Sequence, residues 1–212
     1  MTTIYLIRHS EKYNKSNYLN IHTNEEEIIL QEKVILDVKG EKMAEEMSKR
    51  EEFQNLDAIY SSNLVRAIST AKYFYESQNL RPIIDDRFDE RRVGIPNDNE
   101  YPDWYFRQFK DMDFKTVGGE SVNDCFERFN EALNEVIKNN KSKRVAIFTH
   151  GNAMIFFLIH YIDRFEVSDY KDFTFIFKDK KIFEGKINFL DTFKLTIDDD
   201  GNISDIEVIR YE

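Results

Sequence analysis

The chain has 212 residues, a formal net charge of −10 and 41% hydrophobic residues. This length and apolar content predict one large domain or two small ones, and the acidic balance argues against general nucleic-acid binding. The single cysteine, Cys125, excludes an intramolecular disulfide and fits a reducing compartment. Because the sequence shows neither a long apolar run nor a signal peptide, we expect a cytoplasmic protein without membrane contact.

The first predicted element is a short buried strand over residues 4–7, followed directly by Arg8 and His9. Its unbroken apolar run is typical of a strand covered on both faces. In open α/β sheets, ligands bind beyond the carboxyl ends of such strands. Arg offers a fork of donors to phosphate or carboxylate, and neutral His can serve as nucleophile, base or metal ligand. Taken alone, the pair is equally compatible with polar residues that simply end a strand.

A polar stretch, residues 10–35, predicts a long loop, a feature that is often functional in compact domains. Asp37 is placed to cap a helix that begins at Val38 and fades near residue 50. A second short strand is expected over residues 56–60.

Residues 61–63 are expected to cap the next helix, which continues to about Glu76. Arg66 falls in the first turn of this helix, just past the end of the preceding strand. A cation there opposes the helix dipole. It is either a solvated charge or the partner of a bound anion.

Residues 82–84 predict a third short strand, and a charged loop with Asp89 and Glu90 follows it. An aromatic and charged insertion then occupies residues around 95–117. Packing and ligand contact explain its aromatic residues equally well. A further helix is expected to start at Glu120 or Ser121 and to bury an apolar stripe.

The clearest strand after the first covers residues 144–149 and ends at His150 and Gly151. The apolar run 153–162 predicts a buried helix immediately after it. Free N–H groups at a helix N-terminus attract phosphate, and glycine lets the backbone approach a ligand closely. The remaining segments that predict β structure are residues 173–177, 192–197 and 203–209. A hairpin turn is expected between the last two of them.

Alternating strands and helices predict an α/β fold, a three-layer α/β/α sandwich with a mostly parallel central sheet flanked by helices. The carboxyl ends of parallel strands share one edge, so Arg8, His9, Arg66 and His150 should gather there. Two guanidinium groups, two imidazoles and a helix N-terminus suit a tetrahedral dianion. One imidazole can attack phosphorus while a nearby acid, with Glu90 as the candidate, protonates the leaving alcohol.

Several segments, in this order, resemble the motifs of the histidine phosphatase superfamily, the phosphoglycerate mutase-like proteins. They are residues 6–11, 61–71, 88–94, 119–121 and 149–152. The resemblance covers about residues 4–160. It implies a phosphoglycerate mutase-like fold, with one histidine phosphatase-like domain over residues 1–212 and a lid-like insertion around 95–117.

The resemblance also implies a metal-independent phosphomonoester hydrolase of the histidine acid phosphatase type, with no cofactor. His9 would be the nucleophile that becomes phosphohistidine, and Glu90 the proton donor, although adjacent Asp89 is left open as the acid. Five residues are expected to bind the phosphoryl group or the substrate: Arg8, Arg66, His150, Gly151 and Ser10. Of these, Arg8, Arg66 and His150 are also expected to be catalytic.

The sequence departs from the family pattern at Ser10, where Gly is usual, at Lys12, where Thr or Ser is frequent, and at Lys15, where Asn is. Two alternatives stay open: a phosphoglycerate mutase-type phosphotransferase and a catalytically weak phospholigand-binding protein. The short interval from Gly94 to Gly118 favours a phosphatase. The expected partner is a small phosphorylated substrate of open identity, and a homodimer is left open.

Overall fold

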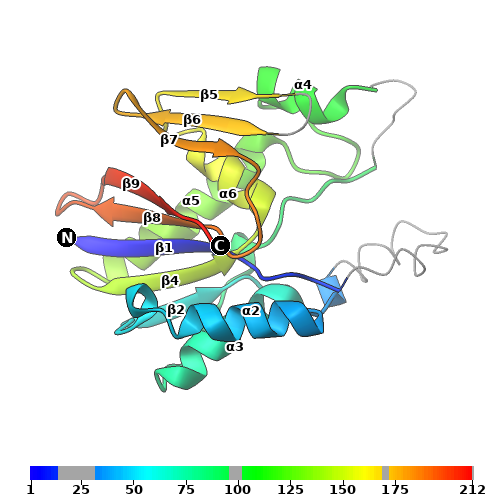
Figure 1. The fold of residues 1–212 in the computed structure, drawn as a ribbon. Helices are drawn as coiled ribbons and strands as arrows, with labels where there is room; N and C mark the ends of the chain where they lie inside the picture. The colour runs from blue at the N-terminus through cyan, green and yellow to red at the C-terminus, as the bar shows by residue number, and fades with distance from the viewer. Residues whose placement is uncertain (14–31, 96–101, 169–171, 212) are drawn as a thin grey trace.

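The structure is a computed structural model that describes residues 1–13, 32–95, 102–168 and 172–211. In this part of the chain, six strands form the main sheet in the order β3-β2-β4-β1-β8-β9 (Figure 1). The first four are parallel, and β8 and β9 are antiparallel additions. Their bounds are β1 Thr2–Arg8, β2 Ala58–Ser61, β3 Pro82–Ile84, β4 Arg144–Thr149, β8 Thr192–Ile197 and β9 Ile203–Ile209.

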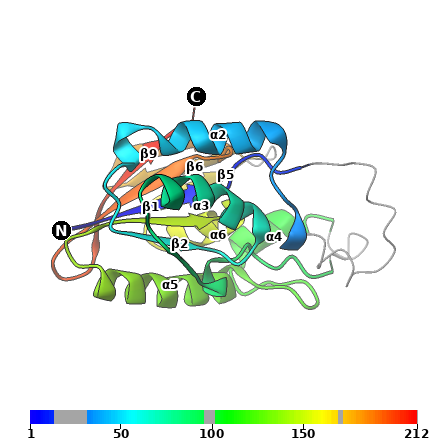
Figure 2. The same cartoon turned by 90° about the horizontal axis from the view of Figure 1, so that it is seen from below.

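Helices cover both faces of this sheet, so the expected three-layer arrangement is confirmed (Figure 2). On one face lie α2 (Val38–Ser48) and α3 (Val65–Ser77). On the other lie α5 (Val122–Asn139) and α6 (Gly151–Leu158). Because a crossover helix follows each parallel strand, the carboxyl ends of β1, β2 and β4 meet at one edge.

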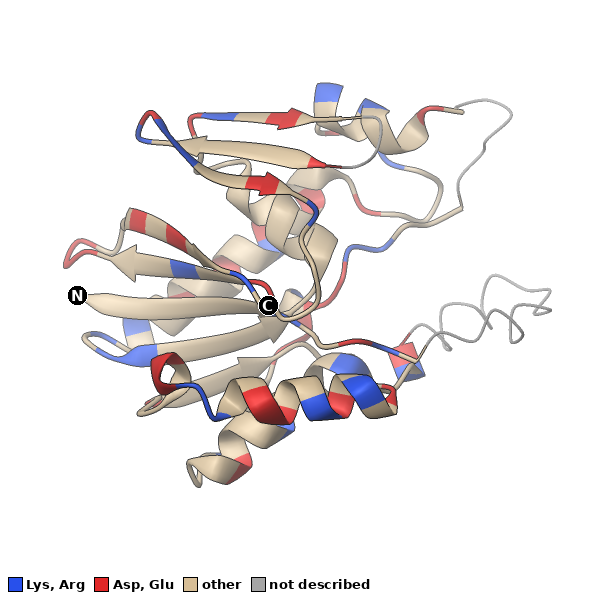
Figure 3. Ribbon diagram, in the orientation of Figure 1, with Lys and Arg blue, Asp and Glu red and all other residues tan. Residues whose placement is uncertain are grey.

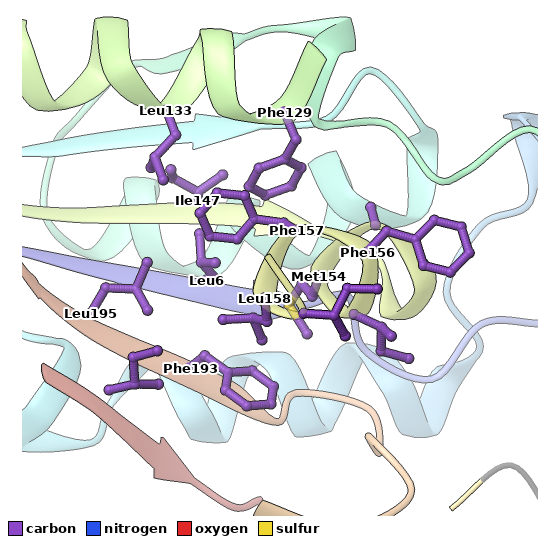
Figure 4. Close-up of a cluster of buried hydrophobic side chains, with 14 of the residues drawn as sticks. Leu6, Phe129, Leu133, Ile147, Met154, Phe156, Phe157, Leu158, Phe193 and Leu195 are labelled. Carbon is purple, nitrogen blue, oxygen red and sulfur yellow. The ribbon is translucent and has the colours of Figure 1, made fainter. Parts of the chain in front are cut away.

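Alternate residues of β1 pack into the apolar clusters on the two faces of the main sheet. Ile4 and Leu6 belong to the apolar cluster under α5 and α6, whereas Tyr5 and Ile7 belong to the cluster under α2 and α3. All four side chains are fully buried. Figure 4 shows part of the first cluster, in which Leu6 lies among side chains of α5, α6 and the neighbouring strands of the main sheet. A strand that is buried on both faces explains the unbroken apolar run at the start of the sequence.

A second sheet of three antiparallel strands lies beside the main one. It contains β5 (Arg164–Val167), β6 (Phe173–Phe177) and β7 (Lys180–Gly185). Of these strands only β6 was expected. The charged residues of β5 and β7 interrupt the alternation of apolar and polar residues that indicates a strand. The small sheet joins the main core through ring contacts of Phe175 and Phe183 with Phe193 of β8.

The insertion around 95–117 carries the short helix α4 (Trp104–Lys110). Phe109 of this helix is 8% exposed, and its ring contacts those of Phe156, Phe165 and Phe173. At this position the aromatic residue belongs to the packing of the core.

Helix starts agree with the sequence at α2 and α5 but differ at α3. The Asp37 carboxylate accepts a hydrogen bond from the N–H of Gly40 at 2.6 Å, and Ser121 forms a capping box with Asp124. The expectation that residues 61–63 cap α3 is wrong, because its N-cap is Leu64, without a side-chain cap. The helix after β4 ends at Leu158, earlier than expected.

Gly40 allows α2 to approach the segment that follows β1. A Cβ atom at this position would lie 2.0 Å from the backbone oxygen of Glu11, closer than any side chain permits. The predicted loop over 10–35 is described only at its ends, and residues 14–31 lie outside the described residues. An antiparallel bridge between Lys12 and Leu36 joins those ends.

Charged residues of both signs are spread over the surface elements rather than gathered by sign. Figure 3 shows acidic and basic residues interspersed along α2, a basic turn between β6 and β7, and an acidic turn between β8 and β9. Among the helices that the structure describes, none is both long enough and apolar enough to cross a membrane.

Candidate active site

The carboxyl ends of β1 and β4 bring His9 and His150 together. These strands are neighbours, and the N–H of His9 donates to the backbone oxygen of Thr149 at 2.9 Å. The two ring centroids lie 5.1 Å apart, and the residues are 3% and 0% exposed. The juxtaposition expected from the sequence is therefore present, and both imidazoles are removed from bulk water.

A backbone carbonyl fixes the tautomer of His9. Its Nδ1 atom lies 2.8 Å from the oxygen of Ser10. A carbonyl oxygen can only accept, so Nδ1 carries the proton and Nε2 holds a lone pair when the ring is neutral. Burial, together with the charges of Arg66 and Arg8, holds the pKa of His9 well below its usual range. The ring is thus neutral at pH 7, with Nε2 available for attack.

Three cations surround the imidazoles. Arg8 ends β1, Arg66 lies in the first turn of α3 and is 4% exposed, and Lys12 follows β1. Burial and the charge of Arg66 lower the pKa of Lys12. Gathering like charges in a region of low solvent access is costly unless an anion neutralises them. The cluster is therefore suited to a dianion, and Arg66 belongs to it despite opposing the helix dipole.

The loop between β7 and β8, which the sequence analysis did not single out, holds Arg8. The Nη1 atom of Arg8 donates to the backbone oxygen of Ile187. Its guanidinium carbon lies 4.5 Å from the ring centroid of Phe189, and that ring is 5.7 Å from the ring of His9. The isolated aromatic residue of this loop gives no local pattern from which its position could be inferred.

Glu90 faces the cationic cluster. Its Oε1 atom accepts a hydrogen bond from the N–H of Ala153 at 3.0 Å, in the first turn of α6. The helix N-terminus favours a carboxylate there. Burial lowers the pKa values of Arg8, Arg66 and Lys12, and the negative charge of Glu90 offsets part of this lowering in each case.

Arg128 of α5 fixes the loop that carries Asp89 and Glu90. It donates to the backbone oxygens of Arg87 at 2.7 Å and Asp89 at 3.0 Å, and its Nε pairs with Glu120 at 2.7 Å. Guanidinium donors in a fixed plane are well suited to such a clamp. These contacts hold the segment after β3, a 3₁₀ turn over Asp86–Phe88 followed by the loop with Asp89 and Glu90, in a defined position.

Asp89 has different partners from those of Glu90. Its Oδ1 atom accepts from the hydroxyl of Ser62 at 2.7 Å and from the N–H of Asn63 at 2.7 Å. The Ser62 hydroxyl oxygen also lies 2.7 Å from Nε2 of His150. Burial raises the pKa of Asp89. Of the two neighbouring carboxylates, Glu90 lies with the cations and Asp89 behind His150.

Ser10 and Gly151 occupy different surroundings. Ser10 is fully buried, and its hydroxyl donates to the backbone oxygen of Gly40 at 2.7 Å. The hydroxyl is therefore engaged with α2 rather than with the cations. The backbone of Ser10 does not have a positive φ, so glycine is not required there. Gly151 adjoins Arg8, because a Cβ atom at residue 151 would lie 3.5 Å from Arg8 Nε.

The only cysteine lies beside the arginine that fixes the acid loop, with its Sγ atom 3.4 Å from Nη2 of Arg128. Cys125 is fully buried, and burial raises its pKa to about 12. A protonated thiol is a poor nucleophile. Within the described ranges, His, Cys, Asp and Glu side chains do not gather in groups of three or more that could hold a metal ion.

The profile described as the histidine phosphatase superfamily (branch 1) matches residues 4–178. The chain therefore belongs to this superfamily. Phosphoserine phosphatase 1 of Hydrogenobacter thermophilus is 30% identical over 128 residues, which span 56% of this chain and 60% of that protein. Phosphoglycerate mutase-like protein 4 of Arabidopsis thaliana is 28% identical over 127 residues, 54% of this chain and 53% of the relative. The chain thus matches little more than half the length of these curated relatives.

Solved structures share the fold over nearly the whole chain. Bacillus stearothermophilus YhfR has a TM-score of 0.66 at 22% identity and covers 96% of each chain. A mycobacterial glucosyl-3-phosphoglycerate phosphatase has a TM-score of 0.66 at 17% identity, with 98% of this chain and 95% of that chain covered. A mutant phosphoserine phosphatase from Entamoeba histolytica, in complex with phosphoserine, has a TM-score of 0.64 at 17% identity, with 98% and 97% covered.

Two buried, neutral histidines make stability depend on pH. In the unfolded chain His9 and His150 titrate near about pH 6.5, whereas burial and nearby cations hold both pKa values well below this in the folded protein. Below pH 6.5 the unfolded state therefore binds more protons. As the pH is lowered below 6.5, the free energy of unfolding should therefore decrease. Each histidine contributes up to about 1.4 kcal/mol per pH unit, until the pH reaches the pKa of that histidine in the folded protein.

Denaturant unfolding at pH 7, 6 and 5 checks this dependence. We expect a shallower fall of the unfolding free energy for His9→Asn than for the wild type, since one of the two buried rings is removed. For comparison, His160→Asn removes a partly buried ring outside the cluster. Burial lowers the pKa of this ring as well, but less than that of His9, so the fall should become shallower by less than in His9→Asn. Equal slopes for the wild type and His9→Asn would contradict the burial of His9 as a neutral ring.

Proposed function

We propose that this member of the superfamily is a phosphomonoesterase that hydrolyses a phosphate ester through a phosphohistidine on His9. The observation that carries the proposal is the state of that ring. Its Nδ1 proton is held by the oxygen of Ser10, and its Nε2 lone pair belongs to a neutral ring among fixed cations. A neutral imidazole beside a dianion-binding cluster is an activated nucleophile for phosphorus.

In the first step, Nε2 of His9 attacks phosphorus, the N–P bond forms and the ester P–O bond breaks. Glu90 donates a proton to the leaving oxygen. In the second step a water molecule gives its proton to Glu90 and attacks phosphorus, and the N–P bond breaks to release phosphate. The guanidinium groups of Arg8 and Arg66 stabilise the charge on the phosphoryl oxygens in both transition states.

The positions of the two carboxylates support Glu90 as the acid. Glu90 is held at the N-terminus of α6 among the cations, whereas Asp89 is bonded to Ser62 and Asn63. Lys12, at a position where the family often has a hydroxyl, adds a third cation to the phosphoryl site. We further propose that His150 and the adjacent Gly151 bind the phosphoryl group, and that Ser10 acts on the site through its contact with α2.

The substrate class that we propose is a small phosphorylated molecule in the cytoplasm. Superfamily relatives with this fold include phosphatases for phosphoserine and for glucosyl-3-phosphoglycerate.

Hydrolysis is favoured over mutase activity by the short segment after the acid loop, closed by the bridge between Ile95 and Val117. We propose that this segment is a lid, because α4 reaches Arg91, beside the acid, through Gln108 and Trp104.

Turnover of a generic aryl phosphate tests the proposed function. The wild type should hydrolyse it between pH 5 and 8 with a chelator present, and His9→Ala should lose at least about a thousandfold, since the nucleophile is gone. His160→Ala, outside the site, serves as the control and should stay within a few-fold of the wild type. Chelator-resistant turnover that survives in His9→Ala would refute the assignment.

The role of Glu90 predicts a dependence on the leaving group. Glu90→Gln should slow hydrolysis of alkyl phosphates by about a hundredfold or more and that of aryl phosphates by less than about tenfold, because aryl oxides need little protonation. Asp86→Asn removes the same charge from an exposed position of the same loop and should change neither rate. Equal losses on both esters in Glu90→Gln would move the acid role to another residue.

A further inference from the structure

Three side chains form a continuous hydrogen-bonded chain behind the proposed phosphoryl site. Nε2 of His150 lies 2.7 Å from Oγ of Ser62, and Oγ donates to Oδ1 of Asp89 at 2.7 Å. They come from three places in the fold: the end of β4, the turn between β2 and α3, and the loop after β3. Ser62 and His150 are fully buried. The two-step reaction described above uses neither Ser62 nor Asp89.

The hydrogen bonds of Ser62 determine which nitrogen of His150 carries the proton. A hydroxyl has one hydrogen and two acceptor sites. The hydrogen is given to Asp89, and the N–H of Leu64 occupies one acceptor site at 3.1 Å. The other site faces His150, so Nε2 must be the donor. In the neutral ring, Nδ1 then holds the lone pair.

That Nδ1 atom is buried and has no hydrogen-bond partner within the described residues. The charges around the ring come from several elements. Arg8 of β1, Arg66 of α3 and Arg128 of α5 are the cations that lower its pKa. The carboxylate of Asp89 is linked to the ring through Ser62, and that of Glu90 accepts from the N–H of Ala153. Burial and the cations hold the pKa of His150 well below its usual range, so the ring is neutral while the site holds no anion.

A bound phosphoryl group changes this balance. A lone pair on Nδ1 repels a phosphoryl oxygen, whereas a proton there makes a charge-assisted hydrogen bond to it. The dianion also neutralises the cations that oppose protonation of the ring. The resulting imidazolium needs a stabilising negative charge on its far side, and Asp89 supplies one through the Ser62 hydroxyl.

We propose that Ser62 and Asp89 are positioning residues that keep the His150 proton on Nε2 and allow the ring to take a second proton, on Nδ1, when a phosphate dianion binds. This inference rests on the proposed function, which places the phosphoryl group at His150. The proton comes from solvent, the bond formed is Nδ1–H, no heavy-atom bond changes, and the imidazolium donates Nδ1–H to a phosphoryl oxygen. Phosphate binding is thereby coupled to the uptake of one proton.

Nitrogen NMR of protein labelled with ¹⁵N-histidine tests the inference without any need for turnover. The chain has four histidines, and substitutions at His9 and His160 assist the assignment of His150. At pH 7 the wild type should show Nε2 protonated and Nδ1 bare at His150. Saturating inorganic phosphate should protonate both nitrogens.

Two variants interrupt the chain in different ways. Asp89→Asn keeps an acceptor for Ser62 but removes the charge, and Ser62→Ala removes the link itself. In both, His150 should stay neutral with phosphate bound, and the affinity for phosphate should fall about tenfold. The double variant should bind no more weakly than either single one, because both break the same chain. Asp86→Asn, on the same loop, should match the wild type.

The outcomes separate this inference from the proposed function. Protonation of His150 by phosphate in Asp89→Asn, as in the wild type, would overturn the inference even if His9-dependent hydrolysis is observed. A proton on Nδ1 of the phosphate-free wild type would also overturn it. If phosphate protonates His150 in the wild type alone but no ester is hydrolysed, the inference stands and the proposed hydrolysis falls.

Discussion

Before a phosphate dianion binds, His9 and His150 are neutral rings beside two guanidinium groups, and much of the architecture maintains this state. Burial removes water that would stabilise an imidazolium, and the cations add repulsion. Each ring has one nitrogen held by a specific partner, Ser10 for His9 and Ser62 for His150. The repulsion between the fixed cations around these neutral rings is costly, and a bound dianion relieves it. The burial and the nearby cations that keep the two histidines neutral for the proposed reaction are also what lowers the stability of the protein at low pH.

The rigid parts of the fold hold this balance in place. Parallel pairing of β1 with β4 fixes the distance between the two histidines, and the residues of β1 are buried on both faces. The less regular parts are fixed by arginine. Arg128 clamps the acid loop through backbone oxygens, and Arg8 is itself held by the loop between β7 and β8. Preorganised charges of this kind lose little energy to reorganisation during reaction.

The sequence predicted the features that depend on local pattern. The apolar run of β1, the cap at Asp37 and the alternation of strands and helices that builds the main sheet follow from spacing and residue type, whereas β5 and β7 were not predicted. Because parallel strands share an edge, even the meeting of His9 with His150 could be expected. The family motifs added the assignment to a superfamily, which the match over residues 4–178 establishes.

What the sequence could not predict depends on contacts between distant segments. Phe189 reaches Arg8 and His9 from a loop some 180 residues away, and nothing in its neighbourhood marks it. Ser62 was expected to cap a helix, but its hydroxyl links Asp89 to His150. Ser10 was expected at the substrate, whereas its hydroxyl bonds to α2. In each case the side chain contacts residues that are distant in the sequence, and the local sequence pattern does not identify them.

The central claim, a covalent phosphohistidine on His9, is tested most directly by trapping the phosphoenzyme. Wild-type protein mixed with an aryl phosphate is quenched in alkali within the first turnover, digested and analysed by mass spectrometry. The account predicts an acid-labile, alkali-stable phosphoryl group on the tryptic peptide that begins at His9. A phosphoryl group on His150 or on a carboxylate, or steady hydrolysis without any covalent adduct, would contradict it.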